Sequence, residues 1–236
     1  MRSRFIKFAL LAVGILAVPI IITNANAATG PVTPKAAPSA SQLLAKVAGC
    51  TQISSGKFAK DEGGSKSIGV CGTKGSRTAP VWWKADMDID CDGVRTSKCN
   101  ENTDCCYQND TSLHQSNGQP MQADLTHFFV IPQNSAAAWH FQDAGIKLGD
   151  VGAVIFNNKL VYAVFADTGP TGIIGEASYA TAQALGINPD PSNGGTDSGV
   201  TYIVFQGADG RVTHNEDHDE ATRIGEARAA ALVSGG

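Results

Sequence analysis

The chain has 236 residues, of which 42% are hydrophobic, and a formal net charge of −4. This length suits one domain with a sizeable core, and the acidic balance argues against nucleic acid as a partner and for a cationic ligand. The sequence has no Gly-x-Ser-x-Gly, phosphate-binding loop or dinucleotide fingerprint, which removes the usual signatures of serine hydrolases, nucleotide enzymes and Rossmann proteins.

The N-terminus has the order of an export signal. Arg2, Arg4 and Lys7 precede an apolar run over 8–22, and Ala25-Asn26-Ala27 offers a small-x-small cleavage site. The run is shorter than the roughly 20 residues that a spanning helix needs. We predict a signal peptide over 1–27, a secreted, extracellular protein and no membrane association after cleavage. The mature chain would keep 15 basic and 22 acidic residues, a net charge of −7.

The remaining chain divides into a lead-in and one domain. Residues 28–40 are rich in Ala, Pro, Thr and Ser, which predicts a flexible segment. A single domain is expected over 41–236, and it begins with a short helix that Ser39 or Ser41 caps and that stops at Gly49.

Strand patterns dominate the middle of the chain. Apolar alternation and β-branched runs predict strands over 127–131, 151–156, 160–166 and 200–205. Asn157-Asn158-Lys159 predicts a tight hairpin, because Asn tolerates the left-handed backbone that a short turn requires. Ala-rich helices are predicted over 176–185 and 221–233. We therefore expect a mainly β fold, a compact barrel with peripheral α-helices.

The six cysteines all lie between 50 and 106. An even number in an exported chain predicts up to three disulfides, with the pairing left open. The zinc alternative lacks a Cys-x-x-Cys pair and a histidine at ligand spacing.

Asp167 and Glu176 are the candidate catalytic pair. Asp167 follows a buried-looking strand, three glycines and a proline shape the loop after it, and Glu176 stands where a helix is expected to begin. Carboxylates on rigid elements, with glycines allowing close approach of a ligand, suit acid/base chemistry. The structural alternative is that Asp167 caps a turn and Glu176 favours the helix dipole. Glu226 lies in a similar Ile-Gly-Glu-Ala sequence without that loop, and we interpret it as a helix residue.

Asp86, Asp88 and Asp90 form a row after two tryptophans. In a strand they would share one face, where like charges about 7 Å apart repel unless a cation or solvent lies beside them. Substrate ammonium groups or calcium could be that cation, and a solvated structural face is the third interpretation. The Asp-x-Asp-x-Asp-Gly sequence that starts at Asp88 opens like an EF-hand loop, but its twelfth position is Cys99 rather than Glu.

Tyr107 and Thr111 are further candidates for substrate binding. They stand in a polar segment beside a turn. Hydroxyl and amide groups of this kind suit sugar hydroxyls, and they suit an ordinary surface loop equally well.

Four motifs in chain order resemble those of one family. They are Ala85-Asp86-Met87-Asp88-Ile89-Asp90-Cys91-Asp92-Gly93, Gly149-Asp150-Val151-Gly152-Ala153-Val154, Asp167-Thr168-Gly169-Pro170 and Ile174-Gly175-Glu176-Ala177-Ser178. From about Cys71 to about Val233 the chain resembles the fungal-type chitosanases of glycoside hydrolase family seventy-five, which also occur in actinobacteria. The segment from Cys99 to Cys106 is not matched to that family.

The resemblance implies endo-hydrolysis of chitosan, a β-1,4-linked glucosamine polymer, with inversion at the anomeric carbon. It also implies that Asp167 and Glu176 are essential, and it implies no cofactor and no protein partner. We expect Asp167 to be the base and Glu176 the acid, because the longer side chain can reach the leaving oxygen. A helix N-terminus at Glu176 would oppose this assignment, since it favours the ionised form.

The strand followed by Asp-Thr-Gly also resembles the double-psi β-barrel glycan-active proteins, which include cellulases, lytic transglycosylases and non-catalytic expansins. Two rival functions follow: a hydrolase of peptidoglycan or cellulose, and an expansin-like binding protein without turnover. The acidic mature chain and the aspartate row favour a polycationic glycan over neutral cellulose.

Overall fold

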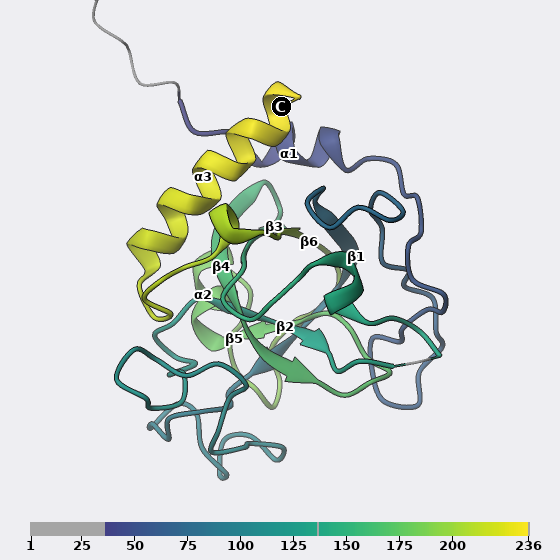
Figure 1. Ribbon diagram of the computed structural model, residues 1–236. Coiled ribbons are helices and arrows are strands. Elements are labelled where there is room, and N and C mark those ends of the chain that lie inside the picture. Colours follow the sequence, from purple (N-terminus) through teal and green to yellow (C-terminus); the bar gives the residue numbers. More distant parts are fainter. Residues whose placement is uncertain (1–35, 136, 236) are drawn as a thin grey trace, which may run out of the picture. The chain divides into compact units, whose positions relative to one another are not determined.

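A computed structural model of the chain describes residues 36–135 and 137–235, and a closed β-barrel lies at its centre (Figure 1). The six strands are β1 (Val81–Asp90), β2 (Phe128–Pro132), β3 (Val151–Phe156), β4 (Lys159–Gly169), β5 (Glu176–Ser178) and β6 (Thr196–Phe205). Around the barrel they follow the order β1-β5-β2-β4-β3-β6. The predicted signal peptide over 1–27 and residues 28–35 of the predicted lead-in lie outside the described residues.

The strand pairing is mixed. β1 pairs with β5, and β2 with β4, in parallel, while the other neighbours are antiparallel. The predicted hairpin joins β3 to β4 through Asn157 and Asn158, whose φ angles are 46° and 64°. The closed barrel confirms the predicted fold class, and its parallel pairs are compatible with the double-psi-like arrangement.

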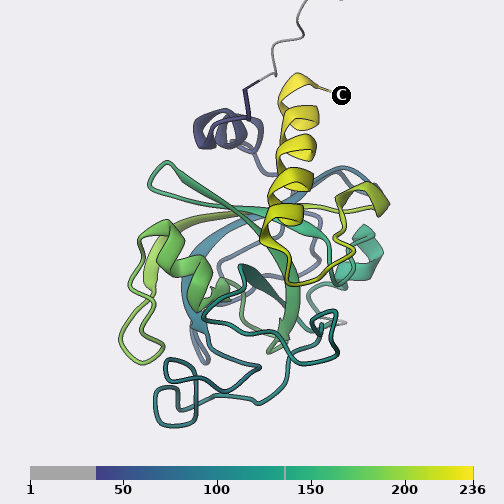
Figure 2. The same cartoon turned by 90° about the vertical axis from the view of Figure 1, so that its left-hand side faces the viewer.

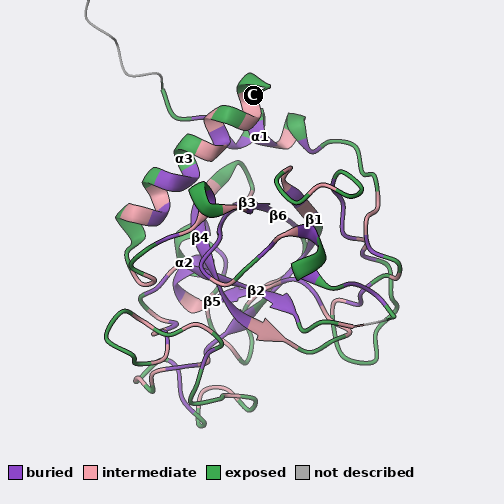
Figure 3. Cartoon of the chain, in the orientation of Figure 1, coloured by how far each residue is buried: buried purple, intermediate pink, exposed green. Residues whose placement is uncertain are grey.

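Helices cover the outside of the barrel. They are α1 (Ala40–Lys46), α2 (Tyr179–Leu185) and α3 (His218–Ser234), with the short 3-10 helices η1 (Phe141–Ala144) and η2 (Ala208–Gly210). Ser39 caps α1 with a capping box. Helices α1 and α3 lie side by side (Figure 2) and pack on outward residues of β3, β4 and β6. In Figure 3, buried and exposed residues alternate along the ribbons of α1 and α3. Within the described ranges, no helix has the length and apolarity to cross a membrane.

The predicted helix over 176–185 begins later than expected. Glu176 to Ser178 form strand β5, which runs parallel to β1, and the helix begins at Tyr179. Ser178 is the N-cap, and its hydroxyl accepts a hydrogen bond from the Thr181 N–H. A serine hydroxyl can satisfy a free N–H group at the first turn, so the helix starts after Ser178.

The side chains of β1 alternate between the barrel interior and its outer face, so the core residues and the aspartate row lie on opposite faces of this strand. Trp83, Ala85, Met87 and Ile89 belong to the core inside the barrel, where the Trp83 ring stacks on Tyr202 at 5.3 Å between centroids. Because successive side chains of a strand point to opposite faces, the three aspartates of β1 lie on the outside.

Two disulfides are present in the described part of the chain, Cys50–Cys71 and Cys91–Cys99. Cys105 and Cys106 are exposed thiols whose sulfur atoms lie 2.9 Å apart. The Cys91–Cys99 pair belongs to a small outer core with Met121, Phe128 and Val130. This core supports the loops that follow β1.

Candidate active site

The candidate catalytic pair lies on the outer face of the barrel. In the parallel pairing of β5 with β1, Glu176 is opposite Asp88 and Ser178 is opposite Asp90. Asp167 stands near the end of β4, which adjoins β2, and β2 in turn adjoins β5. The barrel order therefore brings together carboxylates from β1, β5 and β4.

Asp167 is held in one orientation. Its side chain is 7% exposed, and Oδ1 accepts hydrogen bonds from the Ser112 N–H at 2.9 Å, the Ser112 hydroxyl at 2.8 Å and the Thr168 N–H at 2.7 Å. Burial raises the pKa of Asp167, while these three donors lower it. The donors favour the ionised carboxylate and orient it.

Glu176 has the opposite surroundings. None of the described residues donates a hydrogen bond to its carboxyl group, whose pKa is raised to about 8 by burial and by the charges of Asp88, Asp92 and Asp167. Its position on a strand removes the helix N-terminus that was expected to favour its ionised form. The surroundings of Glu176 therefore favour its protonated form more than those of Asp167 do.

Gly169 makes room for Glu176. A Cβ atom at Gly169 would lie 3.0 Å from Glu176 Oε2, so the carboxyl group occupies the space that a side chain there would need. Gly169 is two residues after Asp167 on β4, and residues two apart on a strand point to the same face. Glu176 and Asp167 consequently lie over the same face of β4.

Asp90 and Asp92 complete the carboxylate cluster. The buried Asp90 accepts a hydrogen bond from the Asp92 N–H at 2.7 Å, and burial together with the charge of Glu176 raises its pKa well above the usual value. Burial and the charge of Asp167 also raise the pKa of Asp92, to about 7. Asp90, Asp92 and Asp167 each place an oxygen within 4.8 Å of the others, so this cluster has the donor atoms for a hard cation.

The aspartate row is less exposed than the sequence suggested. Asp88 is exposed, but Asp86 and Asp90 are only 3% and 5% exposed. Asp86 lies against Gly175, its Oδ1 has no hydrogen-bond partner in the described part of the chain, and burial raises its pKa to about 7. Only Asp88 of the three is exposed, and the substrate contacts predicted for Asp86, Asp88 and Asp90 stay predictions.

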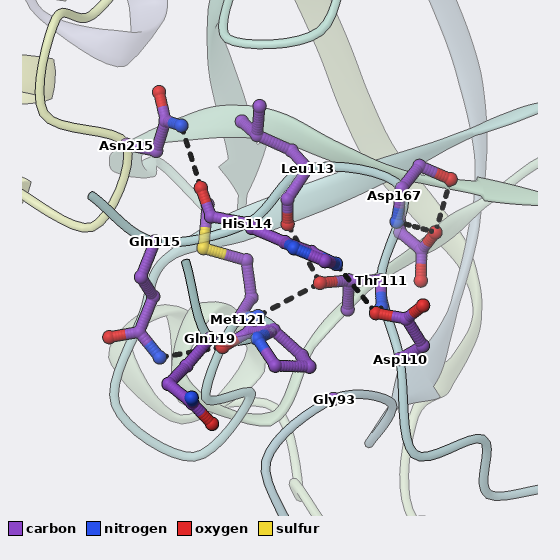
Figure 4. A network of polar contacts seen from close by, with 12 residues as sticks. Gly93, Asp110, Thr111, Leu113, His114, Gln115, Gln119, Met121, Asp167 and Asn215 are labelled. Carbon is purple, nitrogen blue, oxygen red and sulfur yellow. Dashed lines mark hydrogen bonds and ion pairs between the residues drawn. The ribbon is translucent and has the colours of Figure 1, made fainter. Parts of the chain in front are cut away.

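Thr111 is a structural residue. It is 5% exposed, and its hydroxyl donates to the Leu113 carbonyl at 2.7 Å and accepts from the Met121 N–H at 2.8 Å (Figure 4). Both bonds hold the loop that carries Ser112 toward Asp167, and the predicted substrate contact by Thr111 stays a prediction. Tyr107 is half-buried, and its hydroxyl donates to the Gly93 carbonyl at 2.7 Å.

Sequence reasoning missed two members of the site. Asp92 stood in the Asp-x-Asp-x-Asp-Gly pattern but was considered only as a calcium ligand. Ser112 gave no signal, because its partner Asp167 is 55 residues away in the chain. Such a contact depends on the closed barrel rather than on a local pattern.

The comparisons with known proteins identify a family. The family model described as fungal chitosanase of glycosyl hydrolase group 75 matches residues 87–230. Endo-chitosanase C of Aspergillus oryzae is 35% identical over 130 residues, which cover 52% of this chain and 30% of that protein. Endo-chitosanase B of the same species is 33% identical over 132 residues, which cover 52% and 55%. The chain thus spans about a third to a half of the length of these relatives.

Among solved structures, the Streptomyces papain inhibitor is 18% identical, with a TM-score of 0.31 and coverage of 52% of this chain and 94% of that one. The family match is the stronger finding, because it includes β2 to β6, the part of β1 from Met87 onward and both candidate catalytic residues. The chain belongs to the family of fungal chitosanases of glycosyl hydrolase group 75.

Proposed function

We propose that this chain is an endo-chitosanase, that residues 41–236 form its single catalytic domain, and that Asp167 and Glu176 cleave β-1,4-glucosamine linkages with inversion. One observation carries the proposal. On one carboxylate-rich face, Asp167 accepts three hydrogen bonds, whereas Glu176 accepts none and has a pKa raised to about 8. The names of the Aspergillus oryzae relatives support chitosan as the substrate.

The two groups have separate tasks in this mechanism. Asp167, as base, takes a proton from a water molecule while the water oxygen attacks the anomeric carbon. Glu176, as acid, gives its proton to the glycosidic oxygen as the bond from that oxygen to the anomeric carbon breaks. The cycle leaves Asp167 protonated and Glu176 ionised, and exchange with solvent restores both groups.

The spacing of the pair supports inversion. Glu176 Oε2 lies over Gly169, two residues along β4 from Asp167. Residues two apart on a strand have Cα atoms about 7 Å apart. Inverting enzymes hold their two carboxyl groups roughly 6.5–9.5 Å apart, which leaves room for a water molecule, and we expect the pair to fall in this range. Retaining enzymes need the shorter spacing of about 5–5.5 Å.

One face of the barrel carries the carboxyl groups of the site, and we call it the acidic face: Asp86, Asp88, Asp90, Asp92, Asp167 and Glu176. This face supports a polycationic substrate. We propose that the exposed Asp88 contacts a glucosamine ammonium group directly, while Asp86 and Asp90 contribute less, because they are buried and their pKa values are raised. Tyr107 stays a candidate contact at the edge of the site. Calcium at the Asp90, Asp92 and Asp167 cluster is the alternative use of these oxygens.

We also propose that the protein is secreted. Two disulfides suit an oxidising compartment, as does the predicted signal peptide. Neither feature depends on the proposed catalytic roles.

A reducing-sugar assay on chitosan, cellulose and peptidoglycan in parallel tests the activity. We expect turnover on chitosan alone, and proton NMR of the first product should show the α-anomer. Turnover on another polymer would support a different hydrolase, and binding without turnover would support the expansin-like alternative. Activity that is lost with a chelator and restored by calcium would assign the carboxylate cluster to a metal.

A further inference from the structure

A hollow lies beside the acidic face. Its volume is about 460 Å³, within the roughly 300–1,000 Å³ of small-ligand sites. One wall is the loop with Lys98 and Asn102, the other is the loop over 188–193, and Tyr179 contributes from the start of α2. We call this hollow the Tyr179 pocket.

Both walls of the pocket are held close to β1, the strand that carries the aspartate row. The Cys91–Cys99 disulfide ties the Lys98 loop to the residue directly after Asp90. At the end of the second wall, a Cβ atom at Gly195 would lie 3.9 Å from the Asp88 Cα atom. The Ser192 hydroxyl donates to the Thr103 carbonyl at 2.6 Å and joins the two walls. The Tyr179 pocket is therefore next to the carboxylates of β1.

The chemistry of this pocket differs from that of the acidic face. Tyr179, Pro189 and Pro191 provide apolar ring surfaces, and the side-chain amide of Asn102 provides donors and an acceptor. The Asn188 amide bonds to the Asn193 carbonyl and the Asp190 N–H, and it keeps one further donor and acceptor site. The Lys98 ammonium lies 4.9 Å from the centre of the Tyr179 ring. Asp190 is the pocket's carboxylate, and its Oδ1 already accepts the N–H groups of Ser192 and Asn193.

The charge balance selects what can bind. Lys98 and Asp190 leave the pocket without a net charge, whereas the face beside it offers several carboxylates, so a protonated glucosamine is attracted to that face more than to the pocket. An acetylated unit has no charge, its amide can pair with the asparagine side chains, and its methyl group can pack on the proline and tyrosine rings. The pocket thus favours the acetylated sugar over the free amine.

On the basis of the proposed chitosanase function, we infer that the Tyr179 pocket is a subsite for an N-acetylglucosamine unit of partially acetylated chitosan. The enzyme would then cleave at a fixed distance from an acetylated residue, while the acidic face holds the free amines. Lys98 and Tyr179 would determine this specificity without touching the scissile bond.

Two substrates test the inference, fully deacetylated chitosan and partially acetylated chitosan. We expect Lys98→Glu and Tyr179→Ala each to lower the ratio of kcat/KM on the acetylated polymer to that on the deacetylated polymer by roughly tenfold or more. Lys74→Glu makes the same change of charge at an exposed turn outside the pocket, and it should leave the ratio unchanged.

Sequencing of the oligosaccharides that the wild type releases needs no variant. Acetylated units should be enriched at one position relative to the new chain end. A random distribution, or an unchanged ratio in folded variants that still cleave deacetylated chitosan, would overturn the subsite. Failure of the wild type to cleave either polymer would instead overturn the proposed function itself.

Discussion

Asp167 and Glu176 carry the same functional group in different surroundings. Asp167 receives its hydrogen bonds from Ser112 and Thr168, and these bonds stabilise a negative charge. Glu176 lies among other carboxylates, and their charges oppose its ionisation. This difference supports the proposed assignment of base and acid on physical grounds that side-chain length alone does not provide.

Glu176→Gln and Asp167→Asn should each lower kcat on chitosan by about 10²–10⁴-fold, because each removes one proton transfer from the transition state. Glu226→Gln is a matched control, since Glu226 follows the same Ile-Gly pair but is exposed on α3. Initial rates and circular dichroism of the purified proteins provide the measurement. Activity near wild type in a folded Glu176→Gln protein would refute its role as acid.

Glu176 also sets a limit at alkaline pH. An acid with a pKa of about 8 loses its proton as the pH rises through that value, so kcat/KM should fall above about pH 8. Asp92→Asn removes one of the charges that raise this pKa. It should move the alkaline limb of the pH profile, the fall of kcat/KM at high pH, to lower pH. Asp209→Asn, at an exposed position on η2, should leave the limb in place. A limb that does not move in Asp92→Asn would contradict the proposed coupling.

Strand β5 shows where local sequence patterns mislead. The Ala-rich run after Glu176 predicted a helix from that residue, but the backbone at Asp88 donates to the Gly175 carbonyl and holds Glu176 to Ser178 in the barrel. Helix propensity amounts to less than about 1 kcal/mol per residue, so a tertiary pairing overrides it readily. The hairpin at Asn157 and Asn158 was predictable, because its signal is local.

Gly175 is the glycine on which the position of β5 depends. Its φ angle is 127°, and a Cβ atom there would lie 2.9 Å from the Cβ atom of Ala85 and would also meet the Asp86 carboxylate. Gly175→Ala should therefore lower the free energy of unfolding by about 1–3 kcal/mol and reduce activity by displacing Glu176.

Gly172→Ala tests the same loop without strain, since nothing lies within 4 Å of its Cβ position. Its free energy of unfolding should change by less than about 1 kcal/mol. Urea denaturation of both variants provides the comparison. Equal stabilities of the two proteins would show that the backbone at Gly175 tolerates a side chain.

For the whole molecule, the crowded carboxylates make stability depend on pH. Burial raises the pKa of Asp86 to about 7 and that of Glu176 to about 8, above their values in an unfolded chain. The native state therefore binds more protons than the unfolded state. These groups contribute fully to the free energy of unfolding at a pH below their pKa in the unfolded chain. Their contribution is lost as the pH rises through their pKa in the folded protein.

We expect Tm to fall between pH 6.5 and 8.5, and Asp86→Asn should reduce the slope. The range avoids the opposite effect of His127, whose pKa is lowered to about 4 by burial and by His218. Calorimetric scans at several pH values provide the measurement. A Tm that rises over this range would mean that the carboxylates are stabilised as anions in the native state.

The aspartates of β1 and of the loop after it would also make the proposed binding of a cationic ligand a proton-exchange reaction. When ammonium groups approach Asp86 and Asp92, both with pKa values of about 7, the carboxyl groups become stronger acids and lose protons to the buffer. Titration of the Glu176→Gln protein with glucosamine oligomers at pH 7 should give a binding heat that depends on the ionisation enthalpy of the buffer. The difference between the binding heats in phosphate and in Tris gives the number of protons released. Asp86→Asn should decrease that number. A heat identical in the two buffers would indicate that the carboxylates are already ionised before the oligomer arrives.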